Sequence, residues 1–115
     1  MKHMYGRRLV AAVFCLRGGW GSARLLDRID RTLLRANAKP FIGFSDITAL
    51  HALLARDDLV GFHAPMPGSN LVLDGNEDDA RALFDLLMQP LPAGHVFVPS
   101  LAADAWRVPG RASGR

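Results

Sequence analysis

Ser45 lies where a short apolar segment turns directly into a predicted helix, and this position favours chemistry at its hydroxyl. Residues 41–44 predict a strand, and residues 46 to about 56 predict a helix with apolar residues on one side. A tight turn from strand to helix lifts a serine off the end of the sheet, where free N–H groups of the helix can stabilise negative charge. Ser45 is therefore a candidate nucleophile, and the alternative is that it only caps the helix.

A serine nucleophile needs a base and an orienting carboxylate, and the chain offers few candidates for either. Glu77 is the single glutamate and lies at a predicted helix start, where the helix dipole explains it better than catalysis does. His51 falls inside the helix after Ser45, so we expect it to pack or to face solvent. His63 lies at a strand end, where it either lines a pocket or is structural, and His3 and His95 are expected to be exposed.

A second turn, residues 18–22, contains three glycines and also lies between a predicted strand and a predicted helix. Such a turn can hold a phosphate or a carboxylate at the start of the helix that follows it. It does not match Gly-x-Gly-x-x-Gly and lacks the Gly-Lys-Ser/Thr ending of a P-loop, so this turn alone is weak support for a nucleotide site. The Gly-x-Ser-x-Gly elbow of ordinary hydrolases is also incomplete, because Ile47 occupies the position of its second glycine.

The elements that must position these turns alternate along the chain. Apolar residues 9–16 predict a buried, central parallel strand, and helical spacing of apolar residues then predicts an amphipathic helix that ends near Asn37. Residues 59–62 predict a third strand, and residues 76–88 a helix with Asn76 as its N-cap. Residues 96–98 and 106–108 are further candidate strands. This order predicts a doubly wound α/β fold, with a mainly parallel sheet and helices on both faces.

Composition limits the class of protein. The chain has 115 residues, of which 50% are hydrophobic and 22% charged, and this predicts one small globular domain with a real core. The net charge of +3 comes from scattered arginines without interleaved aromatic residues, which argues against a nucleic-acid partner. Cys15 is the single cysteine, so no internal disulfide can form, and we expect a buried structural thiol.

Neither a membrane span nor a secretory signal is predicted. No apolar run approaches the roughly 20 residues that a membrane-spanning helix needs. The basic start followed by apolar residues 9–16 imitates a signal peptide, but Arg17, Gly18, Gly19 and Trp20 follow where small cleavage-site residues belong. The run is better explained as a strand.

Three ordered segments together resemble the LD-carboxypeptidase family, which comprises the muramoyltetrapeptide carboxypeptidases and their microcin-immunity relatives. The segments are residues 15–27, 39–50 and 62–66, and the resemblance extends over about residues 10–66. Trp20 replaces the commoner tyrosine and Ala64 a glycine, changes that affect the shape of the pocket but not the catalytic positions. The family fold is flavodoxin-like, similar to that of class I amidotransferases, and we expect a truncated version of it here.

The resemblance implies a serine peptidase that removes a terminal D-residue from an L,D peptide bond. The typical substrate is the D-alanine end of a murein tetrapeptide, cleaved in the cytoplasm during cell-wall recycling. Ser45 matches the nucleophile, and the backbone N–H groups of Gly19 and Asp46 match the oxyanion hole, with no part for the Asp46 side chain. Trp20 and His63 are candidates for the substrate pocket. No cofactor and no metal are expected.

The resemblance also implies a domain organisation. Residues 1–106 are expected to form an N-terminal-type domain that is incomplete at its start, and residues 107–115 to begin a linker to a C-terminal domain that supplies the catalytic glutamate and histidine. We therefore expect the chain alone to be nearly inactive, with a murein peptide and that missing domain as partners, no nucleic acid or membrane partner, and homodimerisation left open. The alternatives are a non-catalytic phosphate- or nucleotide-binding module and a degenerate remnant.

Overall fold

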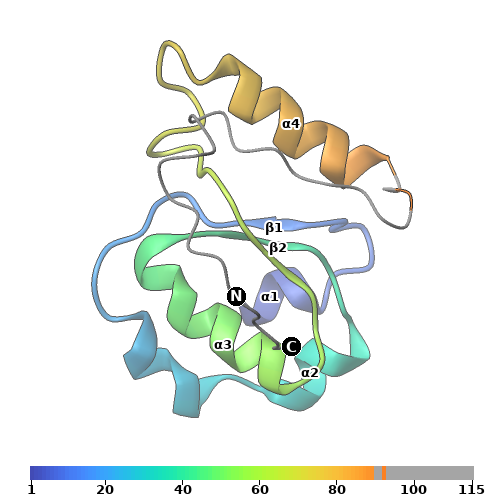
Figure 1. Ribbon diagram of the computed structural model, residues 1–115. Coiled ribbons are helices and arrows are strands. Elements are labelled where there is room, and N and C mark those ends of the chain that lie inside the picture. Colours follow the sequence, from blue (N-terminus) through green and yellow to red (C-terminus); the bar gives the residue numbers. More distant parts are fainter. Residues whose placement is uncertain (90–91, 93–115) are drawn as a thin grey trace, which may run out of the picture.

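The computed structural model describes residues 1–89 and residue 92, which form an α/β fold around a three-stranded parallel sheet (Figure 1). The strands are β1 (Val13–Phe14), β2 (Phe41–Gly43) and β3 (Gly61–His63), in the order β1-β2-β3. Val13 lies opposite Phe41 in the β1–β2 pair, and Ile42 lies opposite Phe62 in the β2–β3 pair. The expected α/β class and parallel sheet are confirmed, while the candidate strands 96–98 and 106–108 fall outside the described residues.

Helices lie on both faces of this sheet. They are α1 (Lys2–Tyr5), the 3-10 helix η1 (Ser22–Arg28), α2 (Arg31–Ala36), the 3-10 helix η2 (Ser45–Ile47), α3 (Thr48–Arg56) and α4 (Glu77–Met88). Neighbouring residues of a strand point to opposite faces, and Val13 of β1 packs into the core with Leu50 and Leu54 of α3. Phe14 instead meets Phe84 of α4, with ring centroids 6.3 Å apart. Figure 1 accordingly shows α3 and α4 on opposite sides of the strands.

The core is centred on β2, whose three residues are all buried. Phe41 and Ile42 are almost completely inaccessible to solvent, and each contributes about 1.5–3 kcal/mol through burial of its side chain. Because its side chains are covered from both faces, β2 has the continuous apolar pattern of a central strand in a parallel sheet. The remaining members of the main cluster come from α1, β1, α2, η2, α3 and the loop after β3: Tyr5, Val13, Leu34, Ile47, Leu50, Leu54 and Met66.

The first predicted strand is much shorter than expected. Of residues 9–16 only Val13 and Phe14 form β1, and Leu9 is fully exposed. Val13 and Cys15 donate their N–H groups to Pro40 and Ile42 at 2.8 and 2.9 Å, and within residues 1–89 β1 pairs with β2 alone. The prediction of a long central strand was wrong because an apolar run reports burial, whereas strand length depends on the number of neighbours available for pairing.

The predicted helix ending near Asn37 is divided in two. η1 ends at Arg28, Ile29 is extended with φ −85° and ψ 125°, and α2 begins at Arg31. The Asp30 carboxylate accepts a hydrogen bond from the Leu33 N–H at 2.9 Å. An aspartate side chain of this kind starts a new helix instead of continuing the old one.

Other boundaries differ by smaller amounts. The third strand is Gly61–His63, so it includes His63, which the sequence placed just beyond the strand. Asn76 precedes α4 as predicted, but its side chain does not cap the helix, since its Nδ2 donates to the Asn70 carbonyl at 2.7 Å. Cys15 is half-buried, and burial raises the pKa of its thiol.

An ionic contact joins α2 to the end of α3. The Arg31 Nε donates to Asp57 Oδ2 at 2.8 Å, its Nη2 bonds to Asp57 Oδ1, and Arg35 approaches the same carboxylate at 3.5 Å. The Asp57 side chain is only 1% exposed. The hydrogen bond from Arg31 is the main reason that the pKa of Asp57 lies below its usual value.

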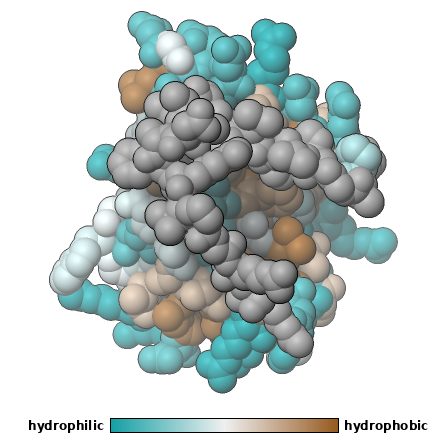
Figure 2. Space-filling view, viewed as in Figure 1, coloured by the Kyte–Doolittle hydropathy of each residue, from teal (hydrophilic) through white to brown (hydrophobic). Residues whose placement is uncertain are grey.

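Much of the visible surface is hydrophilic, with apolar patches between the polar regions (Figure 2). Exposed large apolar side chains include Leu9, Trp20, Val60, Val72 and Met88. Among residues 1–89, no helix combines the length and the hydropathy needed to cross a bilayer.

Candidate active site

Ser45 occupies a strained turn at the end of β2. Phe44 is extended, and Ser45 then has φ 61°, in the left-handed region that residues other than glycine rarely adopt. Ser45 is the first residue of η2, whereas Phe44 takes the N-cap position. The serine is exposed, and its hydroxyl makes no hydrogen bond to another described residue. The position therefore has the geometry of a nucleophile elbow and not that of a helix cap.

The glycine turn lies directly against Ser45, as the sequence led us to expect. A methyl group added at Gly18 would come within 3.0 Å of Ser45 Cβ and 3.2 Å of its Oγ. These are closer than most van der Waals contacts, so a larger residue at position 18 would fit only if Ser45 or the turn shifted by a few tenths of an ångström. The two turns follow β1 and β2, and they meet because parallel neighbouring strands present their carboxyl ends at the same edge of the sheet.

The Asp46 side chain links the two turns. Its Oδ2 accepts hydrogen bonds from the Ser22 N–H at 2.9 Å and the Ser22 hydroxyl at 2.7 Å, and its Oδ1 accepts one from the Gly21 N–H at 3.3 Å. These contacts, led by the bond from the Ser22 hydroxyl, lower the pKa of Asp46. The carboxylate is therefore ionised at neutral pH and lies at the start of η1, where negative charge is favoured.

Sequence reasoning missed this contact. Asp46 and Ser22 belong to different turns, and only the pairing of β1 with β2 brings them together. A usable signal existed in the residue types, because a serine that starts a helix leaves N–H groups free for an acceptor from elsewhere in the chain.

The two backbone donors of the expected oxyanion hole lie on these adjoining turns. Within the described residues, neither the Gly19 N–H nor the Asp46 N–H donates to a protein acceptor, and the first N–H of η2 to do so is that of Ile47, which bonds to the Phe44 carbonyl at 3.3 Å. Free donors of this kind at the start of a helical turn can stabilise a developing oxyanion. The assignment of Gly19 and Asp46 to that role remains a prediction.

An open depression of about 520 Å³ lies over the glycine turn and over Asp46 and Ile47 of η2, next to Ser45, which is not itself part of the lining. Trp20 is 85% exposed at this depression. The Arg24 guanidinium carbon is 4.5 Å from the centre of the Trp20 ring, a cation–π contact. Arg17 also lines the depression, which therefore has a positive, partly aromatic wall. Its full lining is Arg17, Gly18, Gly19, Trp20, Gly21, Ser22, Arg24, Leu25, Asp46 and Ile47.

Among the described residues, His51 of α3 and His63 of β3 pack through their rings on neighbouring aromatic side chains. His51 Nε2 lies 2.8 Å from the Gly43 carbonyl oxygen, and its ring meets the edge of Phe41 at 5.5 Å between centroids. His63 is not part of the lining of the depression, and its ring packs 6.1 Å from that of Phe44 and 6.0 Å from that of His51. Of the two options for His51, packing is the one observed, and the part of His63 in a pocket stays a prediction.

Glu77 opens α4 as predicted, together with Asp78 and Asp79 in the first turn. Such a position suits the helix dipole. In residues 1–89, the His, Cys, Asp and Glu side chains form no group of three that could hold a metal ion.

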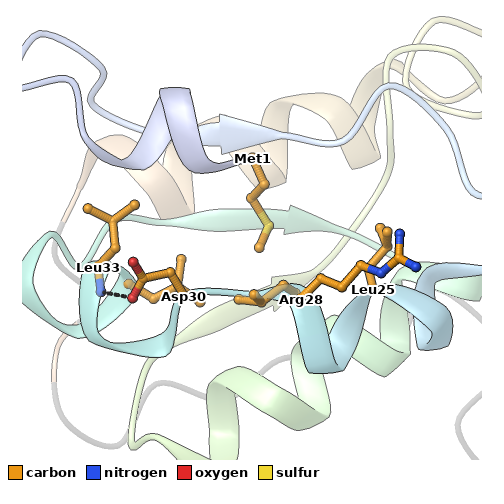
Figure 3. Close-up of a pocket in the computed structure, with 7 residues that line it drawn as sticks. Met1, Leu25, Arg28, Asp30 and Leu33 are labelled. Carbon is orange, nitrogen blue, oxygen red and sulfur yellow. Dashed lines mark hydrogen bonds between the residues drawn. The ribbon is translucent and has the colours of Figure 1, made fainter.

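A second cavity of about 220 Å³ lies apart from both turns (Figure 3). Met1 reaches into it from above, and Leu25, Arg28 and Leu33 line the opposite side. The Asp30 carboxylate beside it is already bonded to the Leu33 N–H. This cavity is mainly apolar and no candidate nucleophile lines it, whereas the open depression adjoins Ser45 through Gly18 and Asp46.

Residues 1–64, which contain both turns, match the family model for the LD-carboxypeptidase N-terminal domain. The chain belongs to the LD-carboxypeptidase family. It is 36% identical over 106 residues to a probable murein peptide carboxypeptidase of Bacillus subtilis, an alignment that covers 91% of this chain and 33% of that protein. It is 43% identical over 58 residues to the murein tetrapeptide carboxypeptidase of Pseudomonas aeruginosa, covering 50% of this chain and 19% of that one.

A solved structure of the LD-carboxypeptidase fold agrees with this assignment. The crystal structure of an MccF-like protein from Bacillus anthracis superimposes with a TM-score of 0.67 and 32% sequence identity, over 73% of this chain and 26% of that one. The resemblance noted in the sequence is thus confirmed at the level of the family. The chain spans about a third of the length of the Bacillus subtilis relative.

Proposed function

We propose that this chain supplies the nucleophile and the oxyanion hole of an L,D-carboxypeptidase. The observation that supports this most is the left-handed conformation of Ser45, which holds an exposed hydroxyl against the glycine turn. In the proposed reaction, Ser45 Oγ attacks the carbonyl carbon before a terminal D-residue and gives up its proton to a base. The electron pair of the carbonyl moves to oxygen, where the N–H groups of Gly19 and Asp46 bind it.

The intermediate then collapses. The C–N bond breaks, the amine leaves with a proton returned by the same base, and the acyl group stays on Ser45 until water hydrolyses it. Each oxyanion donor is expected to stabilise the transition state by about 3 kcal/mol.

The substrate that we propose is a murein peptide ending in D-alanine, as in cytoplasmic cell-wall recycling. The names of the relatives from Bacillus subtilis and Pseudomonas aeruginosa support this substrate class. A carboxypeptidase must also recognise a free terminal carboxylate. Arg24, held over the Trp20 ring, and Arg17 both line the depression and can provide the positive charge for that recognition.

The base and its orienting carboxylate are proposed to come from a C-terminal domain. Within the described residues, no imidazole–carboxylate pair lies against the Ser45 hydroxyl, because the His51 and His63 rings pack on Phe41, Phe44 and one another. Without that base, binding and the oxyanion hole alone leave roughly 10³ to 10⁴-fold rate enhancement over water. We therefore expect the chain alone to be close to inactive.

The decisive experiment is complementation. The chain is mixed with the separately produced C-terminal domain of the Bacillus subtilis relative, and D-alanine release is measured from a tetrapeptide ending in L-Lys-D-Ala. Release should require both components and should disappear with Ser45→Ala. A peptide ending in L-Ala is the substrate control. The proposal is wrong if the complemented chain releases no more D-alanine than the complemented Ser45→Ala variant.

The alternative of a phosphate-binding module has weaker support. A phosphate at the glycine turn would use the N–H groups at the start of η1. Those of Gly21 and Ser22 already donate to the Asp46 carboxylate, whose negative charge would also repel the phosphate. Titration calorimetry with nucleotides separates the two functions, because tight binding that Gly19→Val abolishes would favour the alternative.

A further inference from the structure

We infer that the Asp46 side chain is a positioning residue for the oxyanion hole, because it fixes the Gly18–Ser22 turn in place against Ser45. This inference rests on the proposed function. The Asp46 carboxylate takes no part in breaking the peptide bond, and its proposed role is to hold the turn that carries Gly19.

Asp46 connects the two turns that carry the proposed oxyanion-hole donors. Its backbone N–H is one proposed donor, on the turn of Ser45, while its carboxylate accepts three hydrogen bonds from the other turn. Gly19, the second proposed donor, lies only two residues before Gly21, the nearest of these contacts. A single residue therefore sets the distance between the two donors.

The glycine turn needs such a contact because its own backbone is permissive. Gly21 has φ 120°, a conformation open to glycine and costly for other residues, and an added methyl group at Gly21 would meet nothing within 4 Å. Three glycines in five residues leave this segment with many accessible conformations when it is not held. A donor displaced by about 1 Å can lower a rate by about a hundredfold.

The contact acts through hydrogen bonds and not through an ion pair. The partners of the carboxylate are neutral N–H and O–H groups of Gly21 and Ser22. Arg17 and Arg24 line the same depression, but in the described part of the chain neither forms a salt bridge with Asp46. We therefore expect the effect of removing the carboxylate to be nearly independent of salt concentration.

The test uses Asp46→Asn, which keeps the backbone N–H and nearly the same volume. An amide has one acceptor oxygen and turns an NH₂ group toward donors, so at least one of the three bonds is lost. In the complemented assay we expect kcat to fall by about ten- to a hundredfold with KM changed less than about threefold. Asp27→Asn, on an exposed aspartate of η1, is the matched control and should retain the parental kcat and KM.

A second pair of measurements separates positioning from a general loss of stability. Ser22→Ala should lower kcat less than Asp46→Asn, and the double variant should be no slower than Asp46→Asn alone, because both changes break the same contact. The shape of the pH–rate profile above about pH 5 should be unchanged in Asp46→Asn, with only its plateau lowered, since a carboxylate with a lowered pKa does not titrate in that range.

Amide NMR on the chain alone tests the contact without any activity. The Gly21 and Ser22 amide signals should shift as the pH falls through the lowered pKa of Asp46, and Asp46→Asn should remove that shift and speed their hydrogen exchange. Unaltered amide signals in Asp46→Asn, or a parental kcat in its complemented sample, would overturn the inference. Absence of D-alanine release from the complemented parent would instead contradict the proposed function, while the amide signals still decide whether Asp46 holds the turn.

Discussion

Gly18 and Ser45 touch so closely that a single methyl group on the glycine would lie 3.0 Å from the serine Cβ and 3.2 Å from its Oγ. The contact joins the glycine turn after β1 to the turn at Ser45 after β2. It makes the position of the Ser45 hydroxyl sensitive to a residue far away in the sequence.

Gly18→Ala should therefore lower the activity of the site while leaving the fold intact. The new methyl group must push Ser45 or the turn aside by a few tenths of an ångström, and because catalysis is sensitive to such displacements we expect kcat to fall several-fold. The measurement is D-alanine release by the complemented variant, with circular dichroism to show that the chain is folded. A folded Gly18→Ala variant with parental activity would show that the two turns do not cooperate.

Arg24→Gln should weaken recognition of the peptide terminus. Arg24 stacks on Trp20 at the rim of the depression, and its charge is the part that a carboxylate would use. We expect KM to rise by about tenfold, with a smaller change in kcat, and the effect should vanish for a substrate whose terminal carboxylate is amidated. Arg28→Gln, on an exposed arginine of the same helix that lines the other cavity, is the control. An equal rise in KM for both variants would show that the effect comes from the overall charge and not from recognition by Arg24.

Asp57→Asn should destabilise the fold in a pH-dependent way. Since Arg31 lowers the pKa of Asp57, the ionised form is favoured in the folded state. Its contribution is present above the ordinary pKa of 3.8 and is lost as the pH falls through the lower folded value. At about pH 7 the melting temperature should drop by roughly 5 °C, and the difference from the parent should shrink toward about pH 3.

The matched control for that experiment is Asp58→Asn. Asp58 is exposed and has φ 55°, a conformation that asparagine tolerates well. Thermal unfolding should be nearly unchanged across the same pH range. If the difference in melting temperature between Asp57→Asn and the parent does not shrink in acid, the ionic contact is not its cause.

Tyr5 gives a spectroscopic prediction, because it is the only tyrosine in the chain. Its hydroxyl is buried without a hydrogen-bond partner among the described residues. Burial, with a smaller effect from Cys15, raises the pKa of Tyr5 from 10.0 to about 12. Tyrosinate absorbance should therefore titrate near pH 12 in the folded chain and near pH 10 in urea. Folding stability should fall as the pH rises through this interval, since ionisation favours the unfolded chain.

Tyr5→Phe should remove this alkaline effect. The variant loses an unpaired buried hydroxyl, so its free energy of unfolding at neutral pH should be unchanged or higher by about 1 kcal/mol. Urea denaturation measures it. A clear loss of stability in Tyr5→Phe would mean that the hydroxyl has a partner after all.

The sequence predicted the parts of the fold that depend on local pattern. Buried β2, the turn at Ser45 and the helix after it follow from an apolar segment that ends in a short turn and a helical repeat. The break at Ile29 was missed because helical spacing of leucines continues through it, and only the Asp30 cap shows where one helix stops and another starts.

The candidate site was predictable in its residue types and not in its contacts. Ser45 and the glycines were recognisable from their place at strand ends. The bonds from Ser22 and Gly21 to Asp46 depend on the pairing of β1 with β2, which no local pattern reports. The close contact between Gly18 and Ser45 also joins residues of two different turns, so no local pattern reports it.

The carbonyl oxygen of Gly43 accepts from two directions, from the His51 ring at 2.8 Å and from the Ala64 N–H at 3.3 Å. A helix and a neighbouring loop thus anchor one atom two positions ahead of the serine. The backbone that leads into Ser45 is therefore held from two sides, whereas the side chain of Trp20 is 85% exposed. Substitutions at Trp20 should accordingly disturb the position of Ser45 less than substitutions of His51 do.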